Sequence, residues 1–241
     1  MIEEHDYTDY LKSVAAKFPK PKAIVIFSAH WESKVQAVSQ VDTYSTIYDF
    51  SGFSDELYSM TYPAKGDHGL AKEIVSLFAN KGIDTVVDTT RGLDHGAWAV
   101  LKLVYPVADI PVVALSVNRH LTAEEQYETG KILGSLKEQD VMIIGSGGAV
   151  HNLRRVNWNS DSVDEWAIAF ENWIQEKIEN WDTASLFRYQ ELAPYAKEAV
   201  PTAEHFIPLL IAMGSGDQER SPELLHRSYQ WGNLSLTVWQ F

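Results

Sequence analysis

Four histidines of this chain stand at expected junctions between secondary-structure elements, where ligands and reacting groups gather in α/β proteins. His30 ends the apolar run AIVIFSA, and His95 lies in RGLDHGAW between a strand and a helix. His151 follows IIGSGGAV, and His205 opens a helix in EHFIPLL. Imidazoles that come together from separate strand ends are suitable ligands for a single iron, zinc, copper or nickel ion. The positions therefore favour the hypothesis of a mononuclear metal site.

Spacing alone leaves a second interpretation open, in which these histidines are capping or hydrogen-bonded groups near the surface. Asp94, next to His95, either orients the imidazole or caps a turn. The other four histidines lie in polar contexts and are expected to be solvated: His5, His68, His120 and His226.

The glycine-rich stretch GSGG at 145–148 has the composition of a phosphate-binding turn. It lacks the dinucleotide fingerprint and a following Lys-Ser/Thr pair, so a turn that needs backbone freedom is the favoured interpretation. Ser146 does not stand in a nucleophile-elbow pattern. Trp166, Phe170 and Trp173 recur at helical spacing, which is typical of core packing.

Apolar runs and amphipathic segments alternate along the chain, and this alternation predicts a layered α/β fold. Gly82 stands at the expected end of one helix, and no linker or internal repeat interrupts the pattern. One domain over residues 1–241 is therefore expected. Strands are expected at 23–29, 83–89, 110–117 and from 141, helices at 7–18, 68–82, 97–106, 122–139, 162–180 and 204–214, and a hairpin at 228–241.

The charge balance excludes several classes of partner. Twenty basic and 33 acidic residues give a formal net charge of −13, which argues against binding to nucleic acid or to an anionic membrane surface. The chain has no cysteine, and hence no disulfide or cysteine-based zinc site. The acidic N-terminus is unlike a secretory signal, and no apolar run approaches the roughly 20 residues that span a bilayer. A cytoplasmic protein is expected.

Seven motifs in order along the chain resemble the DODA-type (4,5-DOPA dioxygenase-like) branch of the class III extradiol ring-cleaving dioxygenases, within the LigB-like superfamily. They are FSAHWES, YDFSGF, LYSMTYPAKG, RGLDHGAW, IPVVALSVN, IIGSGGAVHNLR and EHFIPLLIAMGSG. The resemblance implies an α/β fold with a central mixed sheet, helices on both faces and one divalent metal near the strand ends. It also implies cleavage of a catechol such as dihydroxyphenylalanine by O2 and non-haem Fe(II), with Zn(II) as the alternative metal.

The resemblance also assigns roles to the histidines that stand in matching motifs. His30 of SAHW, His151 of VHNLR and His205 of EHF match positions associated with the metal. His95 of LDHG matches the acid/base or substrate-contacting group, and is the expected catalytic residue. A histidine with a pKa near neutral can take a catechol proton and later return one. His151 is the alternative for this role if it does not bind metal.

The chain departs from the family pattern in two places. Members usually begin with a strand that ends in an HGSP-like motif, whose histidine binds metal, whereas this chain opens at the helix that follows. Truncation is the favoured explanation, with an inactive descendant or a strand supplied by another subunit as alternatives. Reduced stability and self-association into a homo-oligomer are expected consequences. At the second place, Val200 stands where relatives have a histidine before the proline.

Two other classes of function remain open. A binding-only member of the superfamily would consume no oxygen with any catechol. A zinc hydrolase built on the same ligands would work without oxygen, with Glu32 or Glu204 as its candidate general base.

Overall fold

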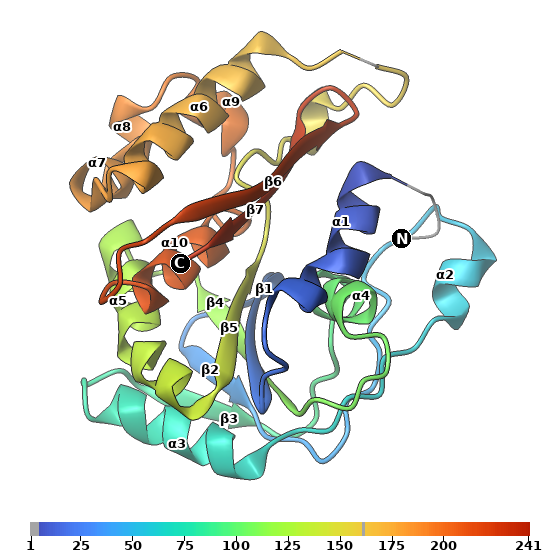
Figure 1. Ribbon diagram of the computed structural model, residues 1–241, viewed down its shortest axis with the longest axis vertical. Helices are drawn as coiled ribbons and strands as arrows, with labels where there is room; N and C mark the ends of the chain where they lie inside the picture. The colour runs from blue at the N-terminus through green and yellow to red at the C-terminus, as the bar shows by residue number, and fades with distance from the viewer. Residues whose placement is uncertain (1–4, 161) are drawn as a thin grey trace. The chain divides into compact units, whose positions relative to one another are not determined.

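The chain folds into two compact units, each described by itself. The computed structural model describes residues 5–160 and 162–241 (Figure 1). The first unit takes in residues 1–118 and 135–146, and the second takes in 119–134 and 147–241. A single domain over 1–241 stays a prediction. None of the helices described is long and apolar enough to cross a membrane.

A five-stranded mixed sheet forms the centre of the first unit. β1 pairs in parallel with β4 on one side and β5 on the other, and β2 pairs in parallel with β3. The β2–β4 contact is antiparallel, with Val38 opposite Leu115. The strands follow the order β3 (Thr85–Asp88), β2 (Gln36–Ser39), β4 (Val112–Asn118), β1 (Ala23–Ser33) and β5 (Val141–Ser146).

Helices flank this sheet and bury its apolar side chains. Trp98 and Leu101 of α4 (His95–Val104) pack in one core cluster with Ile24 and Ile26 of β1. α1 (Asp6–Val14) packs on α4, and α3 (His68–Ala79) packs along β2 and β3. Continuous apolar runs suit strands that are buried on both faces. The expected α/β class, with a central mixed sheet flanked by helices, is confirmed.

β1 carries an irregularity at its carboxyl end. Phe27 pairs with Leu115, but the next pair in register joins Glu32 to Val117. Residues 28–31 therefore face the single residue Ser116 of β4. Such bulges release residues from the ladder and redirect their side chains, often beside active sites. The bulge in β1 contains His30.

Helices and one hairpin make up the second unit. Phe170 of α6 (Glu165–Glu179) is fully buried in its core, as its spacing predicts, and Trp166 and Trp173 pack against the same cluster. The other elements are α5 (Ala123–Leu133), α7 (Thr183–Phe187), α8 (Tyr189–Leu192), α9 (Ala196–Ala199), α10 (Ile207–Ser215), β6 (Glu223–Gln230) and β7 (Leu234–Gln240).

Two glycines let α5 and α10 pack with their backbones nearly touching. A Cβ on Gly130 would lie 1.8 Å from the Ile211 carbonyl oxygen. A Cβ on Gly214 would lie 2.0 Å from the Tyr127 carbonyl oxygen. Any larger residue at either position would force the two helices apart.

Several boundaries differ from those expected. The helix expected at 7–18 ends as a 3-10 turn over Ala15–Lys17, and β2 was not expected. The hairpin begins at Glu223, five residues earlier than expected. His205 does not open α10, which begins at Ile207; it lies in the preceding turn.

Candidate active site

Arg91 fixes the bulge of β1 and thereby positions the His30 side chain. The Nη2 atom of Arg91 donates to the His30 carbonyl oxygen at 3.3 Å and to Asp94 Oδ2 at 3.2 Å. Its guanidinium also stacks over the Trp31 ring, 4.7 Å from the centroid. The backbone at the end of β1 is therefore fixed, and the His30 side chain remains 27% exposed.

Asp94 has a structural role. It is the N-cap of α4, where its Oδ1 accepts the Ala97 N–H at 3.2 Å, and its side chain is buried. The Ser28 hydroxyl of β1 donates to the same oxygen at 2.5 Å. Capping satisfies a helical N–H that has no partner within the helix. Of the two interpretations of Asp94 from the sequence, the cap is confirmed.

Gly96, the second residue of α4, lets the helix start close to β1. A Cβ at this position would lie 2.5 Å from Ser28 Oγ and 3.0 Å from His30 Cδ2. The Ser146 hydroxyl donates to the Gly96 carbonyl oxygen at 2.6 Å, so Ser146 fastens β5 to the helix start. The hydrogen bond from Ser28 to Asp94 joins β1, which carries His30, to the start of α4, which carries His95.

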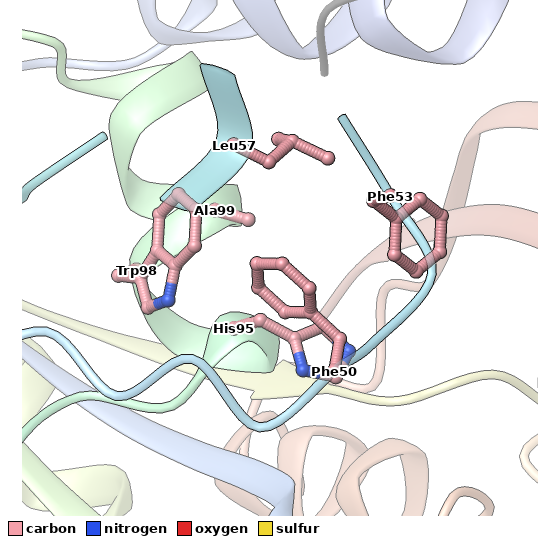
Figure 2. Close-up of a pocket in the computed structure, with 6 residues that line it drawn as sticks. All are labelled: Phe50, Phe53, Leu57, His95, Trp98 and Ala99. Atoms are coloured by element: carbon pink, nitrogen blue, oxygen red, sulfur yellow. The ribbon is translucent and has the colours of Figure 1, made fainter. Parts of the chain in front are cut away.

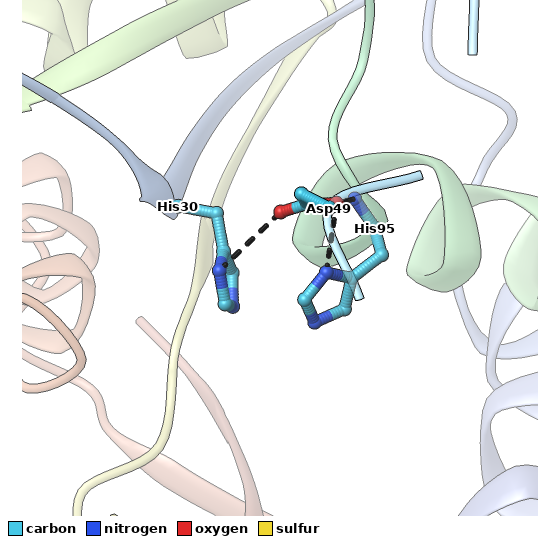
Figure 3. A group of neighbouring side chains, drawn as sticks. All are labelled: His30, Asp49 and His95. Atoms are coloured by element: carbon cyan, nitrogen blue, oxygen red, sulfur yellow. Dashed lines mark hydrogen bonds and ion pairs between the residues drawn. The ribbon is translucent and has the colours of Figure 1, made fainter. Parts of the chain in front are cut away.

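Asp49 connects the two histidines (Figure 3). Its Oδ1 accepts the backbone N–H of His95 at 2.9 Å and lies 2.9 Å from His95 Nδ1. Its Oδ2 lies 3.5 Å from His30 Nδ1. The two imidazole rings are 4.0 Å apart between centroids and are tilted by 50°. Histidines separated by 65 positions in the sequence thus share one carboxylate.

The environment keeps the Asp49 carboxylate ionised. Burial by itself raises the pKa of Asp49, but the backbone N–H and imidazole of His95 lower it by more, so the pKa lies below its usual value. The His95 Nδ1 is buried and faces this carboxylate without an aligned hydrogen bond. A neighbouring carboxylate favours a proton on Nδ1, which makes Nε2 the nitrogen that can accept a proton.

The cluster has the chemistry of a metal site. Among the residues that the structure describes, His30, Asp49 and His95 offer ligand atoms that all lie within 4.8 Å of one another. Two imidazoles and one carboxylate are the donor set of many non-haem Fe(II) oxygenases. The donor types present therefore fit a divalent transition metal. Of these three residues, only His30 is the ligand that its motif predicts, and His95 is the expected acid/base group.

An apolar pocket of about 170 Å³ opens beside His95 (Figure 2). Phe50 stacks edge-to-face on the His95 ring at 5.6 Å and on Phe53 at 5.6 Å. Trp98 lies on the next turn of α4, and its indole Nε1 donates to the Ile47 carbonyl oxygen at 3.0 Å. Leu57 of α2 (Asp55–Ser59) and Ala99 complete the lining. A substrate that reaches His95 meets aromatic and aliphatic walls.

His151 and His205, the other two expected metal ligands, lie together in the second unit. Their rings stack nearly parallel, with centroids 3.5 Å apart and planes 8° from each other. The backbone N–H of His151 donates to the Ala199 carbonyl oxygen at 3.0 Å. Glu204, beside His205, accepts from the Thr202 hydroxyl at 2.8 Å. The metal-binding roles of His30, His151 and His205 stay predictions, as does the catalytic role of His95.

His5, His68 and His226 have partners close by in the sequence or on a neighbouring loop. His5 caps α1 by accepting the Tyr7 N–H at 3.2 Å. His68 lies 2.9 Å from Asp42, and His226 Nε2 lies 2.9 Å from Ser228 Oγ.

No periodic pattern in the sequence points to Asp49. The residue lies in a loop, outside any helix or strand, so no periodicity points to it. Its position in the motif YDFSGF was the available signal, because that motif contains a carboxylate directly beside the aromatic residue that contacts His95.

Comparison with known proteins gives one consistent result. Residues 3–238 match the model of the family described as "Catalytic LigB subunit of aromatic ring-opening dioxygenase". A "4,5-DOPA dioxygenase extradiol" of Beta vulgaris is 44% identical over 92% of this chain and 83% of its own length. The Escherichia coli K12 protein of the same description is 34% identical over 98% of this chain and 88% of its own length.

A solved structure confirms the fold. The crystal structure of an uncharacterized protein from Escherichia coli K12 superposes with a TM-score of 0.87 at 32% sequence identity. The alignment covers 100% of this chain and 95% of the other. Fold and sequence together define an enzyme of the aromatic ring-opening dioxygenase class. The chain belongs to the LigB family, as the seven motifs indicate.

Proposed function

We propose that the chain is a non-haem Fe(II)-dependent extradiol dioxygenase that opens the ring of a catechol-type, DOPA-like substrate with O2. The observation that carries this proposal is the Asp49–His95 pair beside His30, in a chain of the LigB family. The reaction breaks the ring carbon–carbon bond next to the hydroxyl pair. Both atoms of O2 enter the ring-opened product, so no other reductant is needed.

His30 would hold the iron through Nε2. Its Nδ1 faces Asp49 at 3.5 Å, and a metal-bound histidine usually turns its other ring nitrogen toward a carboxylate or carbonyl oxygen. The metal-binding roles of His151 and His205 stay predictions that rest on their motifs. When bound, ferrous iron supplies a centre to which the catecholate oxygens and O2 can both attach.

His95 is the proposed proton carrier. With Nδ1 directed at Asp49, Nε2 is the atom that accepts the proton of a catechol hydroxyl. The same nitrogen returns a proton as the ring opens. Asp49 stabilises the imidazolium between these steps, because its carboxylate lies 2.9 Å from Nδ1.

The aromatic wall has a positioning role. Phe50 packs its ring against both His95 and Phe53, so an aromatic substrate beside His95 contacts carbon rather than water. Exclusion of water strengthens the electrostatic interactions of His95 and Asp49.

Anaerobic loading with Fe(II) tests the proposal. We expect close to one iron per chain, lost in His30→Ala and kept in His68→Ala, which removes an exposed histidine of the same unit. The loaded enzyme should consume O2 and catechol in equal amounts, and the zinc-loaded enzyme should consume none. Ester or amide hydrolysis by the zinc-loaded form without O2 would instead establish a hydrolase. Failure to bind metal would contradict the proposal.

A further inference from the structure

The pocket next to the proposed proton carrier takes half of its lining from one segment, residues 50–60. Phe50, Phe53 and Leu57 come from this segment, and the other three lining residues belong to α4. Figure 2 shows Phe53 and Trp98 on opposite sides of the pocket. The Phe53 side chain is 48% exposed although it lines the pocket, so the pocket is open to solvent beside it.

Both ends of the 50–60 segment are fixed. At the first end, Asp49 Oδ1 accepts the backbone N–H of His95 at 2.9 Å. At the other end, the Met60 carbonyl oxygen accepts from the Tyr48 hydroxyl at 2.8 Å, so the two ends are also tied to each other. The segment is therefore a strap with two anchored ends, and one of its anchors is the carboxylate that orients His95.

The middle of the segment is held by few contacts. Among the residues that the structure describes, every hydrogen bond of residues 50–59 stays within the segment. None of the five residues of α2 is buried. Gly52 has a φ of +83°, and a Cβ there would meet no atom within 4 Å. Regions with few buried contacts and few hydrogen bonds open at a low cost in free energy. The middle of the segment can therefore move while its ends stay in place.

Phe53 is the side chain that gains most from such a movement. Its ring contacts Phe50 edge-to-face at 5.6 Å, but about half of the side chain remains in water. A catechol ring bound at His95 offers a second aromatic surface in the same pocket, and burial of aromatic surface is favourable. Asp55 and Glu56 of α2 are exposed and lie outside the lining, so they can stay hydrated as the segment moves.

We infer that residues 50–60 are a lid that closes over the substrate ring, with Phe53 as the side chain that covers it. The inference rests on the proposed function and deepens it by assigning a substrate-covering residue. Closure of a lid excludes water from the reacting groups. The lid recognises the aromatic ring, and it places no requirement on the substituent that a DOPA-like substrate carries.

Limited proteolysis of the full-length, iron-loaded chain without O2 tests the movement. Chymotrypsin cuts after exposed aromatic residues, and the cleavage rate follows the population of the open form. Phe53 and Tyr58 are the exposed aromatic residues of the segment, and Tyr58 lies outside the pocket lining. We expect dihydroxyphenylalanine to slow cleavage after both residues by about 10-fold. Cleavage after Tyr195, which is 53% exposed in the second unit, should be unchanged.

Two results of this experiment would overturn the inference. Equal cleavage rates with and without dihydroxyphenylalanine would show that the segment does not close. Slower cleavage after Phe53 alone would show that the substrate covers a static wall, because Tyr58 is outside the lining.

Gly52→Ala should hinder closure, since alanine disfavours the left-handed backbone of this position. Gly82→Ala is the matched control, because Gly82 has a φ of +74° and also has no atom within 4 Å of an added Cβ. We expect kcat/KM for dihydroxyphenylalanine to fall by about 10-fold in Gly52→Ala and to stay unchanged in Gly82→Ala. Both variants should bind iron as the wild type does. Equal kinetics of the two variants would overturn the inference.

Phe53→Ala should remove the cover and keep the strap. We expect its KM for dihydroxyphenylalanine to rise by about 10-fold or more, with the iron content unchanged, and Phe53→Tyr to restore the wild-type KM. Val107→Ala shortens an apolar side chain that is 76% exposed and outside the lining, and should leave KM unchanged. A wild-type KM in Phe53→Ala would overturn the role of Phe53.

The proteolysis experiment separates the lid from the proposed function, because it requires no turnover. Slower cleavage after Tyr58, without O2 uptake by any catechol, would mean that the proposed function fails and the lid stands. O2 uptake with an undiminished cleavage rate would mean that the proposed function stands and the lid fails.

Discussion

Asp49 contacts His95 through two different groups: its Oδ1 lies 2.9 Å from the backbone nitrogen and 2.9 Å from the ring Nδ1. The same carboxylate reaches the His30 Nδ1 at 3.5 Å through Oδ2. Both histidines are thus oriented by one acidic residue, and in each of them the Nε2 atom is the one directed away from it. The arrangement gives Asp49 a positioning role toward both the proposed ligand and the proposed proton carrier.

Asp49→Asn should separate positioning from metal binding. An asparagine oxygen can still accept the His95 N–H, but the charge that stabilises an imidazolium is lost. We expect iron stoichiometry and KM to change little, while kcat falls by about 10- to 100-fold, as for other residues that support metal ligands. Asp55→Asn, an exposed change in the same segment, is the control. Loss of iron in Asp49→Asn would make Asp49 a metal ligand instead.

His95→Gln should remove the proton carrier and leave the metal bound. Glutamine fills much of the space of histidine but cannot take up a proton. We expect kcat to fall by about 10²- to 10⁴-fold, the usual contribution of general acid–base catalysis. Iron analysis of the same sample shows whether kcat falls with the iron still bound. A variant with wild-type kcat would exclude His95 from the reaction.

Gly96→Ala should displace His30 by steric overlap, without a change of charge or of any hydrogen-bonding group. The added Cβ would meet Ser28 Oγ at 2.5 Å and His30 Cδ2 at 3.0 Å, so His30 must move. We expect a loss of about 1–3 kcal/mol in the free energy of unfolding, together with weaker iron binding. Thermal unfolding and iron titration measure the two effects.

Gly69→Ala provides a matched control, because the Asp-His-Gly start of α4 recurs at the start of α3. There the nearest atom to the added Cβ is Asp67 Oδ1, at 3.3 Å. Alanine also has the higher helix propensity, so this variant should be neutral or slightly stabilised. Equal effects of the two substitutions would contradict the close approach at Gly96.

Asp217 should make the stability of the second unit depend on pH. Burial raises the pKa of Asp217, but Tyr127, Lys131 and Arg220 outweigh it and lower the pKa to about 2. A carboxyl group whose pKa is lower in the folded state stabilises the fold at any pH above its pKa in the unfolded state, about 3.9 for aspartate. This stabilisation is lost as the pH falls toward 2.

We therefore expect Asp217→Asn to lower the free energy of unfolding by about 1–2 kcal/mol at pH 7, since it loses charged hydrogen bonds. The difference in the free energy of unfolding between the variant and the wild type should become smaller below pH 4. Urea unfolding at pH 7 and at pH 3 measures it, with Asp9→Asn, an exposed pair with Lys12, as the control. A difference that is the same at both pH values would contradict the assigned pairing.

The sequence predicts the framework of the first unit well, because buried strands have a strong signature. Continuous apolar runs predict β1, β4 and β5, and the helical periodicity of the apolar residues predicts α4. The sequence does not predict β2, because QAVS is only four residues long and shows no clear alternation of apolar and polar residues. The sequence also does not predict the bulge at 28–31, because the bulge depends on how β1 pairs with β4.

The candidate site was predicted only in part. His30 and His95 could be selected because both stand where a buried element ends, and the structure brings their rings within 4.0 Å. Their link through Asp49 depends on the path of a loop, which no local pattern specifies. His151 and His205 were also selected, and their stacking in the second unit is a tertiary feature. Their roles, the metal, the cytoplasmic location and the oligomeric state stay predictions.

A single turnover under ¹⁸O2 tests whether this chain inserts both oxygen atoms into a catechol. The iron-loaded enzyme and a catechol are mixed with labelled oxygen. The ring-opened product is reduced at once, so that its carbonyl oxygen cannot exchange with water, and its mass is measured by mass spectrometry. Extradiol cleavage predicts two ¹⁸O atoms in each product molecule. The rate of product formation by His95→Gln should be lower than that of the wild type by at least about 100-fold. A product with one labelled atom or none would contradict extradiol dioxygenation by this chain.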